Sequence, residues 1–144
     1  DRQSPVLTCK TVLADDEYDR YGIVAGEAVG EGLMKMSNII EKPGKENAPS
    51  NLASVSSYLL TGELFSYLEN AKSSYDGQGE FNIQPIMQQM IDEGHEYIAC
   101  EIQDGTYYDT GNKLEYLKTV IDFGLSHDEL GPDLRAYIQA RLQR

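Results

Sequence analysis

The chain has 144 residues, of which 24 are acidic and 12 are basic, so its formal net charge is −12. This charge argues against nucleic acid or an anionic membrane surface as a partner, because both bind basic patches. No apolar run approaches the roughly 20 residues that a membrane-spanning helix needs, and the length predicts a single domain over residues 1–144.

The first half of the chain predicts strands separated by short loops. Residues 6–13 are apolar and β-branched, which is typical of a buried strand. Asp15–Glu17 gives three consecutive carboxylates, which could gather around a metal ion but are more simply a solvated charged loop. Three glycines over residues 26–32 predict a turn, and two prolines over residues 43–50 predict a loop. Further strands are expected over residues 21–24, 33–41 and 51–60.

Helices dominate the second half. Thr61 is a plausible N-cap for a helix with Leu64, Phe65, Leu68 and Ala71 on one face. The clearest helical pattern places apolar residues at i, i+3, i+4, i+7 and i+8, preceding a stop at Gly94. Those residues are Ile83, Ile86, Met87, Met90 and Ile91, with Pro85 in the first turn.

After a strand over residues 97–102, two more helices are predicted. One begins at Asn112 and runs to about Gly124, with Leu114, Leu117 and Ile121 facing inward. Pro132 opens the last helix, with Leu134, Ile138 and Leu142 on one face. Strands that alternate with helices predict an α/β fold with a mixed sheet flanked by helices.

Cysteines and histidines carry little chemical signal here. Cys9 and Cys100 lie singly in strand-like runs, which indicates buried, reduced thiols and a cytoplasmic protein. His95 and His127 have no nucleophile or second ligand beside them in the sequence, so both are expected to be structural or exposed.

Five short motifs occur in one order along the chain. They are Arg20–Val24, Ile40–Pro43, Ala48–Ala53, Tyr108–Leu114 and His127–Gly131. In this order the chain resembles the C-terminal half of the bacterial UTP–glucose-1-phosphate uridylyltransferases, within the sugar-1-phosphate nucleotidyltransferase family. The resemblance runs from about Val6 to the end, and it implies the C-terminal half of a Rossmann-like nucleotidyltransferase fold. The glycine-rich nucleotide loop of that family has no counterpart in this chain, so we expect a fragment that is inactive alone.

The resemblance implies roles for two residues of the Glu-Lys-Pro motif and for Gly22 of the earlier Arg20–Val24 motif. Glu41 would accept hydrogen bonds from sugar hydroxyls, and Lys42, the catalytic candidate, would reach the sugar phosphate. Gly22 would bring bare backbone close to the sugar, where a side chain would block it. Taken alone, Glu41 and Lys42 would be a surface pair leading into a turn, and Gly22 a glycine at a strand entry.

Further implied roles concern a metal ion and the remaining pocket. Asp109 would bind Mg²⁺, which takes one or two carboxylates beside phosphate and water oxygens; the alternative is helix capping by Asp109 or Asn112. Asn51 and Tyr58 would line the sugar pocket. The implied substrates are UTP and glucose 1-phosphate, with no nucleic acid or membrane partner, and the implied assembly is a homo-oligomer.

Several positions depart from the family pattern. The usual Gly-Glu-Ile-Gln-Leu-Thr-Asp stretch is replaced by residues 79–85, so that Gln84 stands in place of threonine and Pro85 in place of aspartate. Ser54 and Ser56 replace an apolar residue and a glycine, and Glu115 replaces a glycine. These departures leave two alternatives open, a thymidylyltransferase and a non-catalytic, degenerate binding or assembly module.

Overall fold

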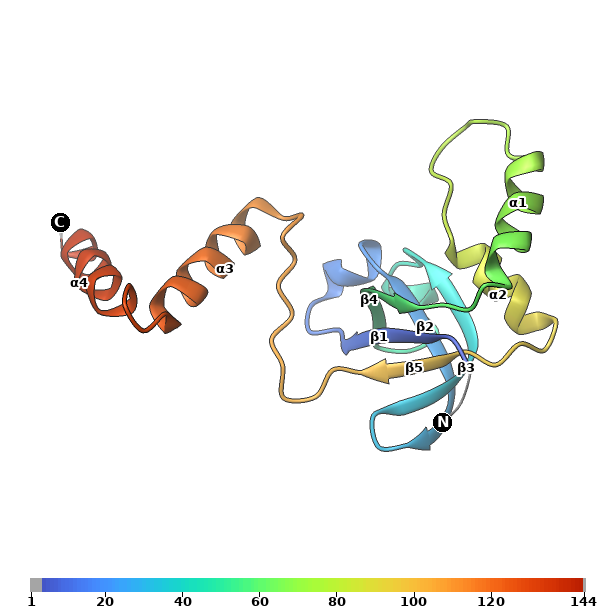
Figure 1. The fold of residues 1–144 in the computed structure, drawn as a ribbon, viewed down its shortest axis with the longest axis horizontal. Coiled ribbons are helices and arrows are strands. Elements are labelled where there is room, and N and C mark those ends of the chain that lie inside the picture. Colours follow the sequence, from blue (N-terminus) through green and yellow to red (C-terminus); the bar gives the residue numbers. More distant parts are fainter. Residues whose placement is uncertain (1–3, 144) are drawn as a thin grey trace. The chain divides into compact units, whose positions relative to one another are not determined.

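The computed structural model describes residues 4–143 (Figure 1). The chain divides into two compact units, Asp1–Asp104 and Gly105–Arg144. Within the described residues, the first unit holds five strands and two α-helices, and the second holds two α-helices. A single domain over residues 1–144 stays a prediction.

The strands of the first unit form one mixed sheet that closes on itself in the order β1-β4-β2-β3-β5. β1 and β5 pair in parallel, whereas the other neighbouring strands pair antiparallel. The prediction of an α/β fold with a mixed sheet is therefore confirmed. The strands are β1 (Val6–Thr11), β2 (Gly22–Gly30), β3 (Leu33–Glu41), β4 (Leu52–Leu59) and β5 (Ile98–Glu101).

Glycines in the second strand make a bulge where the sequence predicted a turn. β2 continues to Gly30, and only the following two residues turn, with Gly32 at a φ of 62°. A Cβ atom on Gly26 would overlap the carbonyl oxygen of Lys35 on β3. The β2–β3 register shifts at this point, as it does at a bulge. The predicted turn over residues 26–32 is wrong because glycine serves a close backbone approach inside a strand as well as a turn.

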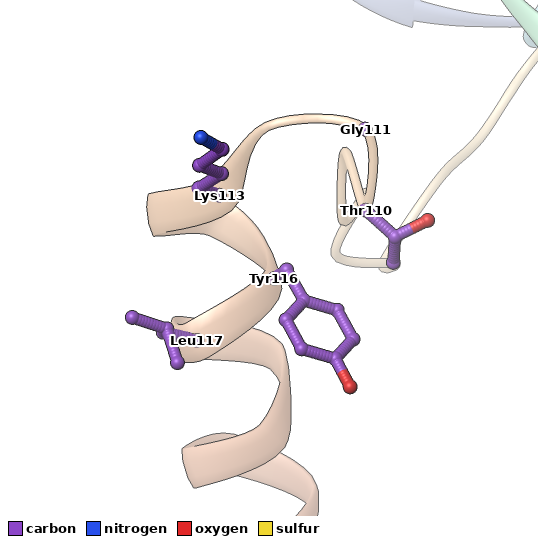
Figure 2. A pocket seen from close by; sticks show the side chains of 5 residues that line it. All are labelled: Thr110, Gly111, Lys113, Tyr116 and Leu117. Atoms are coloured by element: carbon purple, nitrogen blue, oxygen red, sulfur yellow. The ribbon is translucent and has the colours of Figure 1, made fainter.

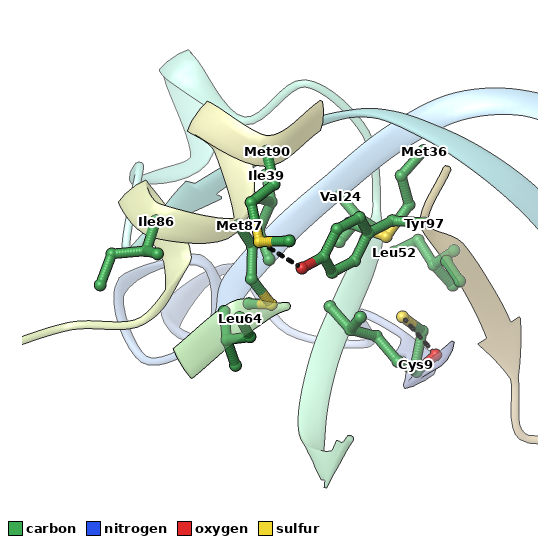
Figure 3. Close-up of a cluster of buried hydrophobic side chains, with 12 residues drawn as sticks. Cys9, Val24, Met36, Ile39, Leu52, Leu64, Ile86, Met87, Met90 and Tyr97 are labelled. Atoms are coloured by element: carbon green, nitrogen blue, oxygen red, sulfur yellow. Dashed lines mark hydrogen bonds between the residues drawn. The ribbon is translucent and has the colours of Figure 1, made fainter. Parts of the chain in front are cut away.

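The core of the first unit lies between the inner face of the sheet and two helices, α1 (Leu64–Ser74) and α2 (Gln84–Asp92). Figure 3 shows Tyr97 among side chains from both helices and several strands, with its hydroxyl donating to Met90 Sδ at 3.1 Å. Thioether sulfur is a weak acceptor. Burial removes water from the Tyr97 hydroxyl group and so raises the pKa of Tyr97 to about 12.

The helix α2 follows the predicted pattern. Ile86, Met87 and Met90 are buried, Pro85 lies in the first turn, and Gly94 has a φ of 97° just beyond the end. The side chain of Gln88 accepts a hydrogen bond from the backbone N–H of Ile39 at 2.8 Å, which ties α2 to β3.

The helix α1 begins later than predicted. Its first residue is Leu64 and its N-cap position is Glu63, with no side-chain capping bond, while Thr61 contributes only its carbonyl oxygen to the Leu64 N–H. Leu64, Leu68 and Ala71 pack on the core as expected. Phe65 is 68% exposed, because it lies about 100° around the helix from Leu64. The predicted Thr61 cap is wrong, and so is the placement of Phe65 on one face with Leu64, Leu68 and Ala71.

The second unit is a pair of helices, α3 (Lys113–Ser126) and α4 (Gly131–Leu142). A Cβ atom on Gly124 would lie 2.5 Å from Leu134 Cδ2, so that glycine allows the two helices to approach closely. The residues predicted to face inward on α3 are exposed: Leu114 by 60%, Leu117 by 57% and Ile121 by 42%. This prediction is wrong for the described structure because within this unit only α4 packs against α3.

The acidic run over residues 15–17 is only partly a solvated loop. Asp15 and Asp16 are exposed, whereas Glu17 is 8% exposed and accepts hydrogen bonds from Lys10 Nζ at 2.5 Å and from the Leu13 N–H at 2.9 Å. Although burial opposes it, these partners hold the pKa of Glu17 below its ordinary value. The solvated-loop prediction is wrong for Glu17, because a 3₁₀ turn places this carboxylate beside Lys10 of β1.

The cysteines are free thiols, as predicted. Cys9 is buried, and burial above all raises its pKa to about 12, whereas Cys100 is half-buried. Across the described residues, no helix is long and apolar enough to cross a membrane.

Candidate functional site

Two predicted site residues meet where β2 begins and β3 ends. Gly22 and Glu41 face each other as paired residues of these antiparallel strands. A Cβ atom on Gly22 would lie 3.0 Å from Glu41 Oε2, tighter than nearly all real contacts of this kind. Gly22 therefore makes room for the Glu41 carboxylate, a neighbour that the sequence did not reveal.

The Glu41 carboxylate is largely withdrawn from water. Its Oε1 lies 3.7 Å from Lys42 Nζ, while its Oε2 is buried and has no hydrogen-bond partner within residues 4–143. Burial is the main reason that the pKa of Glu41 lies above its ordinary value, with Lys42 opposing the shift. An unsatisfied buried oxygen costs free energy until a donor reaches it. Glu41 thus offers an open acceptor to a ligand hydroxyl.

Lys42 sits at a sharp turn directly after β3. Its φ is 47°, and its backbone N–H donates to the carbonyl oxygen of Tyr21 at 3.1 Å. The Nζ atom lies 3.2 Å from Glu80 Oε2 on the loop before α2, and this hydrogen bond is the main reason that the pKa of Lys42 is raised. The half-exposed ammonium group is therefore held charged beside Glu41.

Tyr58 lies on the same face of the sheet as Glu41 and contacts Ser54, which the sequence marked only as a departure. Ser54 on β4 pairs with Gly22 on β2 and is buried. Its hydroxyl donates to the Tyr58 hydroxyl at 3.4 Å. Because paired residues of antiparallel strands face the same side, Ser54 and Glu41 share the sheet face with Tyr58. That face continues into the hydrophobic core, against which Tyr58 packs.

Asn51 does not join the cluster. It precedes β4 by one residue, is exposed, and accepts a hydrogen bond from the Val12 N–H through its backbone carbonyl at 2.8 Å. Asn51 lies three positions before Ser54, which is about 10 Å along an extended chain. Its pocket-lining role stays a prediction.

Asp109, the predicted metal ligand, belongs to the second unit. Its Oδ1 accepts a hydrogen bond from the Gly111 N–H at 3.1 Å, and its carbonyl oxygen accepts one from the Asn112 N–H. The helix cap is Asn112, whose side chain accepts hydrogen bonds from the N–H groups of Leu114 and Glu115. Of the two capping candidates, the structure thus selects Asn112.

The described residues contain no group of three or more His, Cys, Asp or Glu side chains that could hold a metal ion. Asp109 can offer one carboxylate, which fits an ion such as Mg²⁺ if phosphate and water oxygens complete its shell. Beside Asp109, a cavity of about 300 Å³ is lined by Thr110, Gly111, Lys113, Tyr116 and Leu117. In Figure 2 the Tyr116 ring lies on the same side of the helix as Thr110, whereas Lys113 and Leu117 project from the other side.

The two histidines have structural roles, as predicted. His127 Nδ1 accepts hydrogen bonds from the N–H groups of Glu129 and Leu130 in the turn between α3 and α4. His95 lies 3.3 Å from a Glu63 carboxylate oxygen and 3.2 Å from the Tyr67 hydroxyl, next to the start of β5.

Comparison with known proteins identifies the family of this chain. The family described as nucleotidyl transferase matches residues 2–123. The chain is 35% identical over 124 residues to a UTP–glucose-1-phosphate uridylyltransferase of Streptococcus pneumoniae, a match that covers 85% of this chain and 40% of that protein. Its counterpart from Staphylococcus epidermidis is 33% identical over 128 residues, covering 88% and 43%. The chain thus spans less than half the length of these curated relatives.

Solved structures show the same likeness. The UTP-bound UGPase of Acinetobacter baumannii aligns with a TM-score of 0.77 and 30% identity, covering 95% of this chain and 45% of that one. A UDP-glucose pyrophosphorylase complexed with UDP-glucose aligns with a TM-score of 0.74 and 28% identity, covering 84% and 44%. The predicted nucleotidyltransferase fold is confirmed by these alignments.

Proposed function

Because the chain belongs to the nucleotidyl transferase family, we propose that it supplies the sugar-phosphate side of a site that makes UDP-glucose. The substrates of the whole enzyme are UTP and glucose 1-phosphate, and the products are UDP-glucose and pyrophosphate. The names of the relatives and of their complexes support this assignment.

One observation carries the proposal in this chain, namely the unpartnered oxygen of Glu41. A sugar phosphate presents hydroxyl donors next to an anion. The buried carboxylate oxygen of Glu41 can accept from a hydroxyl, and the neighbouring Lys42 ammonium group can pair with the phosphate. Glu41 binds a sugar hydroxyl, and Gly22 leaves space beside it. Tyr58 borders the same face of the sheet.

The reaction joins two anions, so the site must supply positive charge. An oxygen of the sugar phosphate bonds to the α-phosphorus of UTP while the bond from that phosphorus to pyrophosphate breaks. In a chain of net charge −12, Lys42 brings a cation next to the sugar-binding carboxylate. The sugar phosphate takes the place of Glu80 at Lys42 Nζ, since both are anions competing for one ammonium group.

Asp109 contributes one carboxylate towards Mg²⁺. When bound, such an ion neutralises phosphate charge and holds the reacting groups in line. Assembly as a homo-oligomer and a cytoplasmic location belong to this proposal as well.

Replacement of Lys42 by alanine tests the assignment in the complete gene product that contains this sequence. We expect Lys42→Ala to raise the KM for glucose 1-phosphate by about tenfold or more, because one charge-assisted contact to phosphate is lost. The KM for UTP should stay nearly constant, and steady-state pyrophosphate release measures both.

The matched control is Lys45→Ala. Lys45 lies three residues away, and its Nζ pairs with Asp15 on the surface at 2.8 Å. An identical kinetic response of the two variants, or none in Lys42→Ala, would make Lys42 an ordinary surface lysine.

A further inference from the structure

The side chain of Gln84, the first residue of α2, lies close to Gly22 and Glu41. A Cβ atom on Gly22 would be 3.5 Å from Gln84 Cγ and 3.8 Å from Gln84 Nε2, beside the 3.0 Å contact with Glu41 Oε2. Gln84 Nε2 and the buried Glu41 oxygen that has no partner therefore border the same point and lie no more than 6.8 Å apart, the sum of their distances from it. The two polar groups come from parts of the chain that are 43 residues apart.

Gln84 differs in its hydrogen bonding from Gln88 and Gln89, the two other glutamines of α2. Gln88 accepts from the Ile39 N–H at 2.8 Å, and Gln89 donates to Glu93 at 2.8 Å. Over residues 4–143, the Gln84 side chain takes part in no such bond. A half-buried amide with two donors and one acceptor is thus left available at the edge of the site.

The position of Gln84 relative to Glu41 is fixed by its surroundings. Gln88 lies one helical turn after Gln84, and its partner Ile39 lies two residues before Glu41 on β3. That one hydrogen bond ties the helix carrying the amide to the strand carrying the carboxylate. Ile86 and Met87 anchor the same turn of the helix in the core.

Gln84 also replaces the threonine of the usual Gly-Glu-Ile-Gln-Leu-Thr-Asp stretch. A longer side chain with an amide in place of a hydroxyl changes both the space and the hydrogen-bonding groups beside Glu41. The substituted residue, Gln84, therefore lies where it can contact a sugar that binds at Glu41.

We propose that the Gln84 amide binds a hydroxyl group of the hexose 1-phosphate together with Glu41, and that this pair determines which hexose is accepted. The inference rests on the proposed function and adds a specificity-determining residue to it. A site that hydrogen-bonds a particular hydroxyl discriminates strongly against an isomer that lacks it in that place, because its own polar groups are then left unpaired.

The test compares Gln84→Ala with wild type in the complete gene product. Steady-state kinetics with glucose 1-phosphate, galactose 1-phosphate and UTP give KM and kcat for each. We expect Gln84→Ala to raise the KM for glucose 1-phosphate about tenfold. We expect the preference between the two epimers to shrink by a similar factor, with the KM for UTP unchanged.

A second variant and a control keep the test decisive. Gln84→Glu keeps the size of the side chain but sets a carboxylate beside Glu41, so it should weaken sugar binding more than the alanine change does. Gln89→Ala removes an amide from an exposed position of the same helix and should leave sugar kinetics at the wild-type level.

The outcomes separate this inference from the proposed function. Wild-type turnover of glucose 1-phosphate with unchanged KM and epimer preference in both Gln84 variants would overturn the role of Gln84 alone. A wild-type protein that neither binds nor turns over glucose 1-phosphate would overturn the proposed function, and the inference with it.

Discussion

Glu41 and Asp109 are both carboxylates to which the resemblance gave binding roles, yet their surroundings differ. Glu41 has a buried oxygen without a partner and a pKa raised chiefly by burial. Asp109 already accepts a hydrogen bond from the Gly111 N–H, in a loop that leads into a capped helix. Glu41 is suited to a neutral hydroxyl donor, whereas Asp109 is the carboxylate that we propose as a ligand of a cation.

Replacement of Asp109 by asparagine separates metal binding from loop structure. Asparagine keeps an oxygen that can accept from Gly111, so we expect Asp109→Asn to leave the melting temperature almost unchanged. A neutral amide is a poorer ligand for a hard cation, so the Mg²⁺ concentration for half-maximal activity should rise. Activity titrated with Mg²⁺ in the complete gene product measures the shift. A wild-type Mg²⁺ response would leave the loop bond as the role of Asp109.

At the scale of elements, the bulge at Gly26 holds β2 and β3 in the register that pairs Gly22 with Glu41. The shift at Gly26 separates two stretches of pairing, and the stretch nearer the site runs from Gly22↔Glu41 to Ala25↔Asn38. Any side chain at Gly26 would collide with backbone of β3, which cannot move as a flexible side chain can. The bulge is thus a requirement of the sheet that carries the site.

We therefore expect Gly26→Ala to destabilise the fold by about 1–3 kcal/mol, the range for strain that the backbone must absorb. Thermal and urea unfolding followed by circular dichroism measure the loss. Gly30→Ala is the control within the same strand, because its Cβ would first meet a Leu33 side-chain atom at 3.4 Å, an ordinary contact. Equal stability of the two variants would contradict the role of the bulge.

For the whole molecule, we expect the 144-residue polypeptide to show no uridylyltransferase turnover by itself. Its sequence holds no glycine-rich loop for a triphosphate, and it spans 40% of the relative from Streptococcus pneumoniae. Pyrophosphate release from UTP and glucose 1-phosphate is the assay, on protein shown to be folded by a cooperative thermal transition. Turnover above the no-protein control would mean that these residues form a complete site.

The charge of the whole chain bears on the proposed phosphate contact, because few cations are available for it. With twice as many acidic as basic side chains, most lysines and arginines near the first unit's surface face carboxylates. Lys42 likewise pairs with Glu80. It also follows Glu41 directly at the end of β3, and its Nζ lies 3.7 Å from the Glu41 carboxylate. Because acidic side chains outnumber basic ones, few cations are available to neutralise a bound phosphate, and Lys42 is the one that we propose.

By itself the sequence determined the features that depend on local spacing. The periodicity of residues 83–91 predicted α2 and its buried face, and the apolar run of residues 6–13 predicted β1. Residues 33–41 predicted β3 with both of its ends. The motif around Glu41 and Lys42 was recognisable because it is contiguous. These patterns repeat within a few residues, so neighbouring side chains suffice to reveal them.

The tertiary structure alone decided which distant residues share a site. Strand register placed Gly22 between Ser54 and Glu41, and the packing of α2 brought Gln84 close to Gly22. It also left Asn51 exposed before the start of β4 and buried Glu17 against Lys10. Register and helix packing depend on contacts between segments far apart in the chain. A local pattern cannot encode those contacts, because the side chains that create them are not neighbours in sequence.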